Sequence, residues 1–183
     1  MNLWTKFAVY SVFETERLIL RPPLFTDAED FHDIARNPEN LQFIFPVQTS
    51  LAESQFALAN YFMKQPLGVW MICEKESQRM IGCIKFEKLD EVKREAELGY
   101  FLHKDYWGQG LMTECLRELA FLSFQVFELK VLRIITHQEN IASQKVAKKS
   151  GFKLSRHFKG SDRYTRKMRD YLEFRLEKEQ FHE

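Results

Sequence analysis

The change of hydrophobic period in the middle of the chain restricts the fold more than any other feature. Residues 69–75, 80–88 and 95–102 are rich in β-branched and aromatic side chains, and the polar segments 76–79 and 90–94 separate them. Consecutive strands that are joined by short turns pair antiparallel. The sequence therefore predicts an antiparallel meander over residues 69–102.

Helical signals lie on both sides of this meander. Capping boxes that begin at Thr26 and Ser50 predict two helices before it. Asn140 is the expected cap of a helix that stops at Gly151. We also expect a helix that ends at about residue 124. Further strands are expected at residues 17–21, 131–137 and 171–176, and one more from residue 152 onward. We expect one domain over residues 1–183, of the mixed α/β (α+β) class, with a largely antiparallel central sheet and helices on both faces.

Composition excludes several functional classes. The chain has 27 basic and 26 acidic residues and a net charge of +1, so its overall charge does not indicate nucleic-acid binding. Three cysteines, at positions 73, 83 and 115, match no metal spacing, and we expect neither a structural disulfide nor a metal site. No apolar run approaches the length that spans a membrane. We expect a cytoplasmic protein that binds neither a membrane nor nucleic acid.

The positive charge is uneven along the chain. Between Lys145 and Arg169 there are ten Lys or Arg residues and one acid, Asp162. Such a run is either a solvated face or a site that attracts a multiply charged anion. If the run bound nucleic acid instead, the affinity would fall steeply with salt.

A turn with two glycines follows the meander. Trp107-Gly108-Gln109-Gly110 stands between the strand at 95–102 and the next helix. Glycine lets backbone amides approach a ligand closely, and a helix N-terminus adds free N–H groups and a positive dipole end. The turn is therefore either an anion site suited to phosphates or a plain tight turn. Neither a Rossmann fingerprint nor a P-loop is present.

Three motifs together resemble the GNAT (Gcn5-related) N-acetyltransferase superfamily, in its RimJ/RimL branch of ribosomal-protein N-terminal acetyltransferases. The segment 15–22, Thr-Glu-Arg-Leu-Ile-Leu-Arg-Pro, is similar to the first strand of that branch. Residues 106–114 are similar to its acetyl-CoA pyrophosphate loop, although Trp107 and Met112 depart from the general GNAT pattern. Residues 140–143 and 150–152 are similar to its second cofactor motif. The resemblance covers about residues 14–178.

The resemblance implies that acetyl-CoA is the co-substrate, with no metal, in a cleft between splayed strands at 97–102 and 131–137. Backbone groups of the strand would pair with the pantetheine arm, and loop amides would hold the pyrophosphate. Asn140 would bind the pantetheine, and Lys145 and Lys148 would meet the 3′-phosphate. The implied cofactor-binding residues are Tyr100, Phe101, Leu102, Trp107, Gly108, Gln109, Gly110, Leu111, Met112, Thr113, Asn140, Ser143, Lys145 and Lys148.

The implied chemistry is direct attack of an amine on the thioester. Glu97 is the candidate base, with His137 or water as alternatives, or Glu97 is a solvated strand residue. The amide of Phe101 would polarise the thioester carbonyl. Ser143 would donate to the leaving thiolate, or is an ordinary helix N-terminal serine. Phe43, Phe45 and Trp70 either line an acceptor pocket or belong to the core.

The expected activity is transfer of an acetyl group to an amine acceptor, most simply a protein N-terminus. An α-amine has a pKa near ~7.7–8.0 and a lysine a pKa near ~10.4, so a base has to remove a proton from a smaller fraction of an α-amine. A small-molecule amine, such as a polyamine, amino sugar, amino acid or antibiotic, is the first alternative. A non-catalytic domain that senses acetyl-CoA is the second. The protein is expected to be a monomer or a homodimer.

Overall fold

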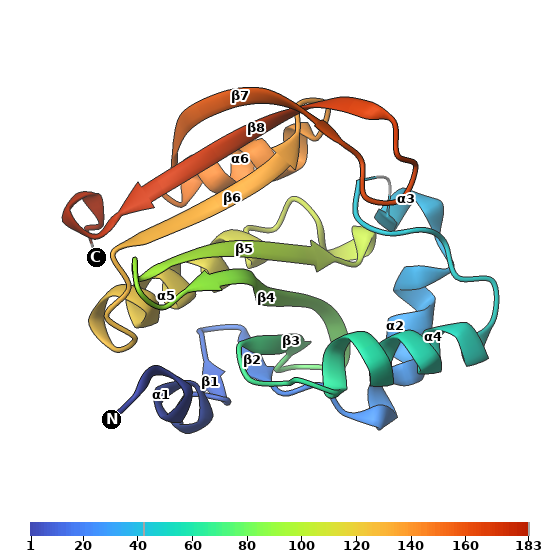
Figure 1. Ribbon diagram of the computed structural model, residues 1–183. Helices are drawn as coiled ribbons and strands as arrows, with labels where there is room; N and C mark the ends of the chain where they lie inside the picture. Colours follow the sequence, from blue (N-terminus) through green and yellow to red (C-terminus); the bar gives the residue numbers. More distant parts are fainter. Residues whose placement is uncertain (42, 183) are drawn as a thin grey trace. The chain divides into compact units, whose positions relative to one another are not determined.

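A computed structural model describes residues 1–41 and 43–182, which form two compact units (Figure 1). Unit 1 comprises residues 1–85 and 100–111, and unit 2 comprises residues 86–99 and 112–183. The division passes through two strands, β4 (Met80–Asp90) and β5 (Glu95–Leu102), so each unit contains a part of both.

Unit 1 contains an antiparallel sheet in the order β1-β2-β3-β4. Its strands are β1 (Phe13–Glu14), β2 (Leu18–Arg21), β3 (Val69–Glu74) and the first half of β4. Hydrophobic residues alternate along β2, where Leu18 and Leu20 are buried, as expected for a strand with one face on the core. The predicted strands at 17–21, 69–75 and 80–88 are therefore confirmed within one or two residues.

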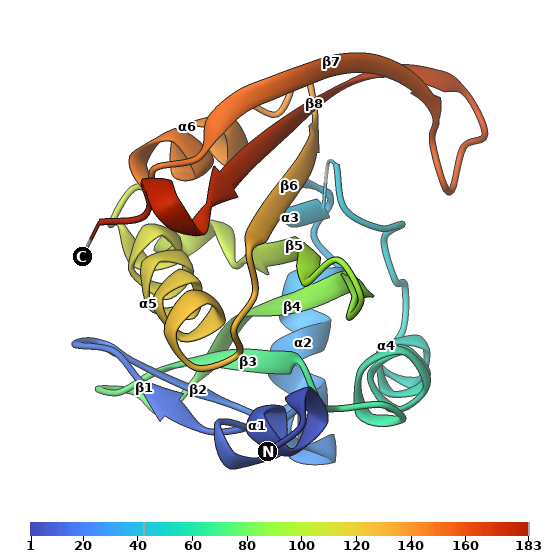
Figure 2. The same ribbon diagram turned by 60° about the vertical axis from the view of Figure 1, so that its left-hand side comes forward.

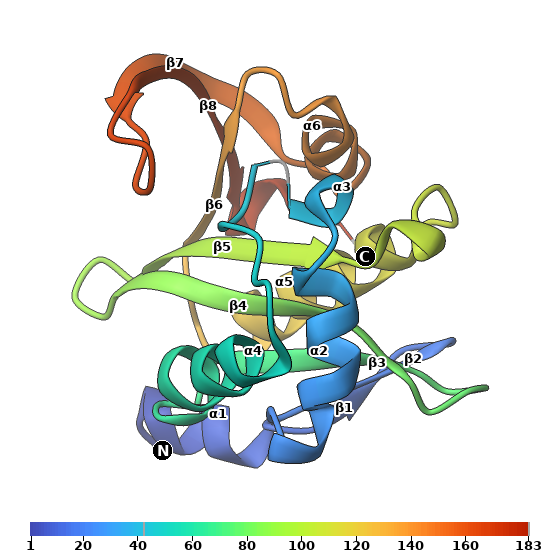
Figure 3. The same cartoon turned by 90° about the vertical axis from the view of Figure 1, so that its right-hand side faces the viewer.

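The helices of unit 1 are α1 (Leu3–Val9), α2 (Ala28–Ala35), α3 (Pro38–Leu41) and α4 (Leu51–Ala57), with a π-helical turn at Leu58–Met63. Helices α2 and α4 pack side by side (Figure 3). The hydroxyl of Ser50 caps α4 by accepting from the amide of Glu53, as predicted. The predicted box at Thr26 is wrong, because a 3₁₀ turn at Phe25–Asp27 precedes α2 and carries no such cap.

Aromatic side chains fill the core of unit 1. The ring of Phe31 in α2 lies 5.4 Å from that of Phe62 and 6.2 Å from that of Phe101. Phe45 closes the cluster at 5.6 Å from Phe101. Trp70 is wholly buried and donates its indole N–H to the carbonyl of Tyr10, so it serves the core.

Unit 2 contains strands in the order β5-β6-β8-β7, with β6 (Val131–His137), β7 (Lys153–Ser161) and β8 (Met168–Glu177). The pair β5–β6 is parallel, whereas β6–β8 and β7–β8 are antiparallel. The helices are α5 (Leu111–Gln125) and α6 (Ile141–Lys149), and α6 lies against β6 (Figure 2). Short 3₁₀ turns at Lys104–Tyr106 and Lys178–Gln180 complete the elements of the chain.

The mixed order of helices and strands gives the predicted mixed α/β fold, with mostly antiparallel strand pairs. Among residues 1–41 and 43–182, no helix is both long and apolar enough to cross a membrane.

Candidate functional site

The turn between β5 and α5 has the backbone shape of an anion site. Gly108 and Gly110 have φ angles of +74° and +76°, a region that glycine adopts without strain. Residues 107–110 are exposed, and α5 begins directly after them at Leu111. The first amides of this 15-residue helix therefore face the end of an exposed turn.

Side chains hold the loop from several directions. The indole Nε1 of Trp107 donates to the carbonyl of Leu102 at 2.8 Å, which anchors the start of the loop to the end of β5. The side-chain amide of Gln109 donates to the carbonyl of Asp105 at 3.3 Å. From the bend directly before β2, Nη1 of Arg17 donates to the carbonyl of Gln109 at 2.9 Å. Trp107 and Gln109 thus tie the loop to carbonyls that precede it, whereas Arg17 contacts a carbonyl of the loop itself.

A buried histidine supports the 3₁₀ turn that precedes the loop. Nδ1 of His103 accepts from the amide of Asp105 at 3.1 Å, and Nε2 lies 3.1 Å from Oδ2 of Asp33. Arg79 pairs with the same Asp33 carboxylate. Burial raises the pKa of Asp33, but hydrogen bonds from Arg36 and His103 outweigh it and leave that pKa lowered. Sequence patterns could not indicate this network, because Asp33 and His103 are 70 positions apart.

The predicted pantetheine-binding residues lie at the end of β5 in unit 1. Phe101 and Leu102 are buried, whereas Tyr100 is half-buried. Gly82 in β4 faces the carbonyl of Phe101, and a Cβ at Gly82 would meet that oxygen. The backbone of Phe101 is therefore held both by its ring, within the aromatic cluster, and by the close approach of β4.

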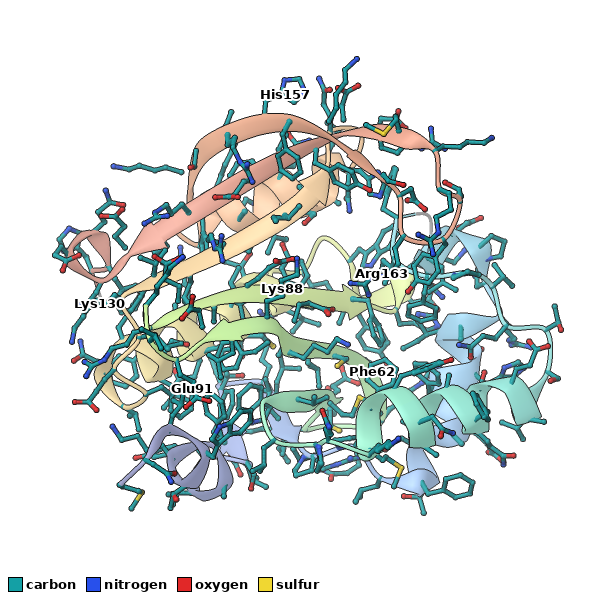
Figure 4. All side chains as sticks on the ribbon, in the orientation of Figure 1. Phe62, Lys88, Glu91, Lys130, His157 and Arg163 are labelled. Atoms are coloured by element: carbon teal, nitrogen blue, oxygen red, sulfur yellow. The ribbon has the colours of Figure 1, made fainter. Side chains whose placement is uncertain are left out.

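Glu97 lies in the part of β5 that belongs to unit 2. Its side chain is 15% exposed, and Nζ of Lys88 of β4, labelled in Figure 4, lies 3.7 Å from its Oε2. In the parallel ladder Glu97 stands opposite Arg133 of β6. A carboxylate in this half-buried position can accept a proton from a bound amine. Its role as base stays a prediction.

Strand pairing changes beyond Leu98. The β5–β6 register runs from Glu95↔Val131 to Leu98↔Ile134, whereas β6 remains paired with β8 as far as His137↔Tyr171. His137 thus lies on the part of β6 beyond this register. Its ring centre is 4.7 Å from that of Tyr171, and its Nε2 is 3.5 Å from Oδ2 of Asp162. Burial lowers the pKa of His137, and the charge of Asp162 opposes that shift.

The N-terminus of α6 carries the second predicted motif. The side chain of Asn140 caps the helix, because its Oδ1 accepts from the amide of Ser143 at 3.1 Å. Ser143 is half-buried, while Lys145 and Lys148 are exposed on the same helix. Asn140 is confirmed as a helix cap, and its role toward the cofactor stays a prediction, as do those of the serine and the two lysines.

The remaining predicted loop residues are distributed along the start of α5. Leu111 and Met112 are buried, and Thr113 is half-buried. Cys115 in the next turn is also buried, and so are Cys73 and Cys83. Within residues 1–41 and 43–182, no group of His, Cys, Asp and Glu side chains could hold a metal ion.

Comparison with known proteins gives a family match over most of the chain. The model of the acetyltransferase (GNAT) domain matches residues 17–153. YoaA of Bacillus subtilis, described as an uncharacterized N-acetyltransferase, is 27% identical over 149 residues, which cover 79% of this chain and 84% of YoaA. The ribosomal-protein-serine acetyltransferase of Escherichia coli is 31% identical over 77 residues, which cover 42% of this chain and 43% of that protein.

Solved structures show the same fold. RimL, a ribosomal L7/L12 alpha-N-protein acetyltransferase in complex with coenzyme A, superimposes with a TM-score of 0.77 at 20% identity. The match covers 91% of this chain and 97% of RimL. The resemblance inferred from the three sequence motifs is confirmed.

Proposed function

The chain belongs to the acetyltransferase (GNAT) domain family, and we propose that it transfers the acetyl group of acetyl-CoA to the α-amino group of a protein or peptide. The observation that carries the proposal is the exposed loop 107–110, with two positive-φ glycines directly before the N-terminus of α5. Backbone amides in this arrangement suit a pyrophosphate, the doubly charged group that joins the nucleotide of coenzyme A to its pantetheine arm.

The residues of this chain fit the cofactor as follows. The amides of residues 109–113 would hold the pyrophosphate, and the backbone of residues 100–102 would pair with the pantetheine arm. Lys145 and Lys148 are exposed cations on α6 that would meet the 3′-phosphate. The thioester of acetyl-CoA supplies an activated acetyl group, and the protein orients it.

The proposed chemistry needs only modest help from side chains. The amide of Phe101 would stabilise the charge that develops on the carbonyl oxygen. The carboxylate of Glu97 would accept a proton from the attacking amine, directly or through a water. As the carbon–nitrogen bond forms, the carbon–sulfur bond breaks, and the hydroxyl of Ser143 would donate to the departing thiolate.

An α-amine is the favoured acceptor class for two reasons. The relatives named above include a ribosomal-protein-serine acetyltransferase and an alpha-N-protein acetyltransferase. In addition, at pH 7 about 9–17% of an α-amine is uncharged, against about one part in 2,500 of a lysine. The reaction at an α-amine therefore requires less removal of protons by the enzyme.

The first test is thermal unfolding with and without acetyl-CoA, with ATP as a control for generic phosphate binding. A ligand at 100 times its Kd adds about 2.7 kcal/mol to the unfolding free energy, which raises the midpoint by roughly 5–11 °C for a chain of this size. A rise with acetyl-CoA and none with ATP supports the proposal. No rise at millimolar acetyl-CoA contradicts it.

The acceptor class is tested by the release of CoA, measured with a thiol reagent. Peptides with a free α-amine and no lysine are compared with Nα-blocked peptides that contain lysine, and with a polyamine. Turnover with the first group alone supports the α-amine. Turnover with the polyamine alone would assign the enzyme to small-molecule amines.

A further inference from the structure

We propose that Arg17 is a positioning residue of the cofactor loop, which locks the Gln109–Gly110 peptide so that the amide of Gly110 faces the pyrophosphate. This inference rests on the proposed function, because it assigns a task within the same cofactor site. No sequence motif indicates it, since Arg17 and Gln109 are 92 positions apart.

The geometry begins with a contact from the bend that directly precedes β2. Nη1 of Arg17 donates to the carbonyl oxygen of Gln109 at 2.9 Å. Nη2 of the same guanidinium lies 3.7 Å from the position that a Cβ of Gly110 would occupy. The planar end of the side chain therefore lies along one side of the Gln109–Gly110 peptide, and both residues belong to unit 1.

A trans peptide places its carbonyl and its N–H on opposite sides. The structure has no cis peptide bonds among its described residues, so the carbonyl of Gln109 and the amide of Gly110 point in opposite directions. Because Arg17 holds the carbonyl on its own side, the Gly110 amide is directed to the other side. That is the direction in which a loop amide can bind an anion.

The Gln109–Gly110 peptide needs a contact that fixes its orientation, because Gln109 stands between two glycines. Gly108 and Gly110 both have positive φ angles, and glycine crosses between backbone conformations with little steric cost. The other side-chain contacts of the loop, from Trp107 to Leu102 and from Gln109 to Asp105, use donors of the loop and leave the orientation of this carbonyl open. A charged donor to a carbonyl is stronger than a neutral one, so an arginine suits the task.

Positioning of the peptide by Arg17 and simple attraction of the phosphates predict different dependence of the affinity on salt. A cation that only attracted the phosphates would lose its effect when salt screens it. A guanidinium that fixes a peptide plane keeps its effect, because the oriented amide remains after the long-range field has been screened.

The test compares the wild-type chain with Arg17→Gln and with Arg117→Gln as a matched control. Arg117 is also an exposed arginine that donates to a main-chain carbonyl, that of Lys149 at 2.8 Å. We expect Arg17→Gln to weaken the Kd for CoA about tenfold, which corresponds to ~1.4 kcal/mol. The loss should persist at high salt, the KM for acetyl-CoA should rise, and kcat should hold. Arg117→Gln should bind CoA like the wild type.

A spectroscopic readout reports the peptide itself. Labelling with ¹⁵N-glycine gives signals from only seven residues, and Gly110→Ala identifies the Gly110 signal by its loss. In the wild type we expect this signal to move when CoA is added. In Arg17→Gln it should start from a different position and move far less at CoA saturation. If the variant unfolds, Arg17→Lys replaces it, and we expect a partial loss of affinity with the same change of signal.

Two results would overturn the inference, and they are distinguishable. If the wild type does not bind CoA, the proposed function fails and the inference fails with it. If the wild type binds CoA and Arg17→Gln binds equally well, or loses affinity only at low salt with an unchanged Gly110 signal, only the positioning role fails.

Discussion

Substitution of Gly82 by alanine tests whether the close approach of β4 fixes the backbone of Phe101. A Cβ at this position would overlap the carbonyl oxygen of Phe101 and lie 3.1 Å from both Cα and Cδ1 of Leu102. Two of these three atoms belong to the backbone, so a rotamer change alone cannot relieve the overlap. The end of β5 would have to move.

The cost of such overpacking is about 1–3 kcal/mol. For a chain of this length, a loss of that size lowers the thermal midpoint by roughly 2–12 °C. If the Phe101 amide polarises the thioester, its displacement should also reduce kcat more than it raises the KM for acetyl-CoA. Differential scanning calorimetry and steady-state kinetics measure the two effects.

Gly160→Ala is the matched control, because the nearest atoms to its Cβ would be side-chain atoms and not backbone, namely ring carbons of Tyr171 at 3.3 Å. A glycine-to-alanine change at a compatible position gains about 0.4–1 kcal/mol through the unfolded state, so its midpoint should hold or rise slightly. An unchanged midpoint and unchanged kcat in Gly82→Ala would refute the reasoning.

Three further predictions concern titratable groups. Glu97→Gln should lower kcat about 10²-fold or more if the carboxylate is the base, whereas an unchanged rate in a CoA-release assay would leave Glu97 as a strand residue. Burial lowers the pKa of His137, so the folded state disfavours its protonation, and the resulting stability is present above ~pH 6.5 and lost as the pH falls below it. Between about pH 7.5 and about pH 5.5, the thermal midpoint of His137→Asn should therefore fall less than that of the wild type. An equal fall in the two proteins would contradict this. Burial raises the pKa of the Cys73 thiol to about 11, and all three cysteines are buried. A thiol reagent should therefore label the native chain slowly and the denatured chain at three sites. Rapid labelling of the native chain would contradict this.

Local sequence patterns predicted the strands well, because alternation of apolar residues reports a half-buried sheet directly. They also predicted the caps at Ser50 and Asn140, which act within three residues of themselves. The helix α1 was not predicted. Its single buried residue is Phe7, so the segment lacks the periodic apolar face from which a helix is inferred.

Contacts between distant segments could not be predicted from local patterns. The expected Thr26 cap is replaced by a 3₁₀ turn in which the Asp27 carboxylate accepts from the Leu24 amide and pairs with Arg21. An ion pair from a neighbouring strand thus outweighs a local capping preference. The Arg17–Gln109 and His103–Asp33 contacts lie further beyond local patterns, since their partners are 92 and 70 positions apart in the sequence.

The parallel pairing of β5 with β6 has a consequence for synthesis of the chain. A parallel neighbour cannot follow through a hairpin, so the whole of α5 must be translated before Val131–Ile134 can pair with Glu95–Leu98. Until then the nascent chain presents an open strand edge at β5, and such edges recruit other chains. Production of this protein is therefore expected to depend on the pace of translation through α5 and on chaperones that shield that edge.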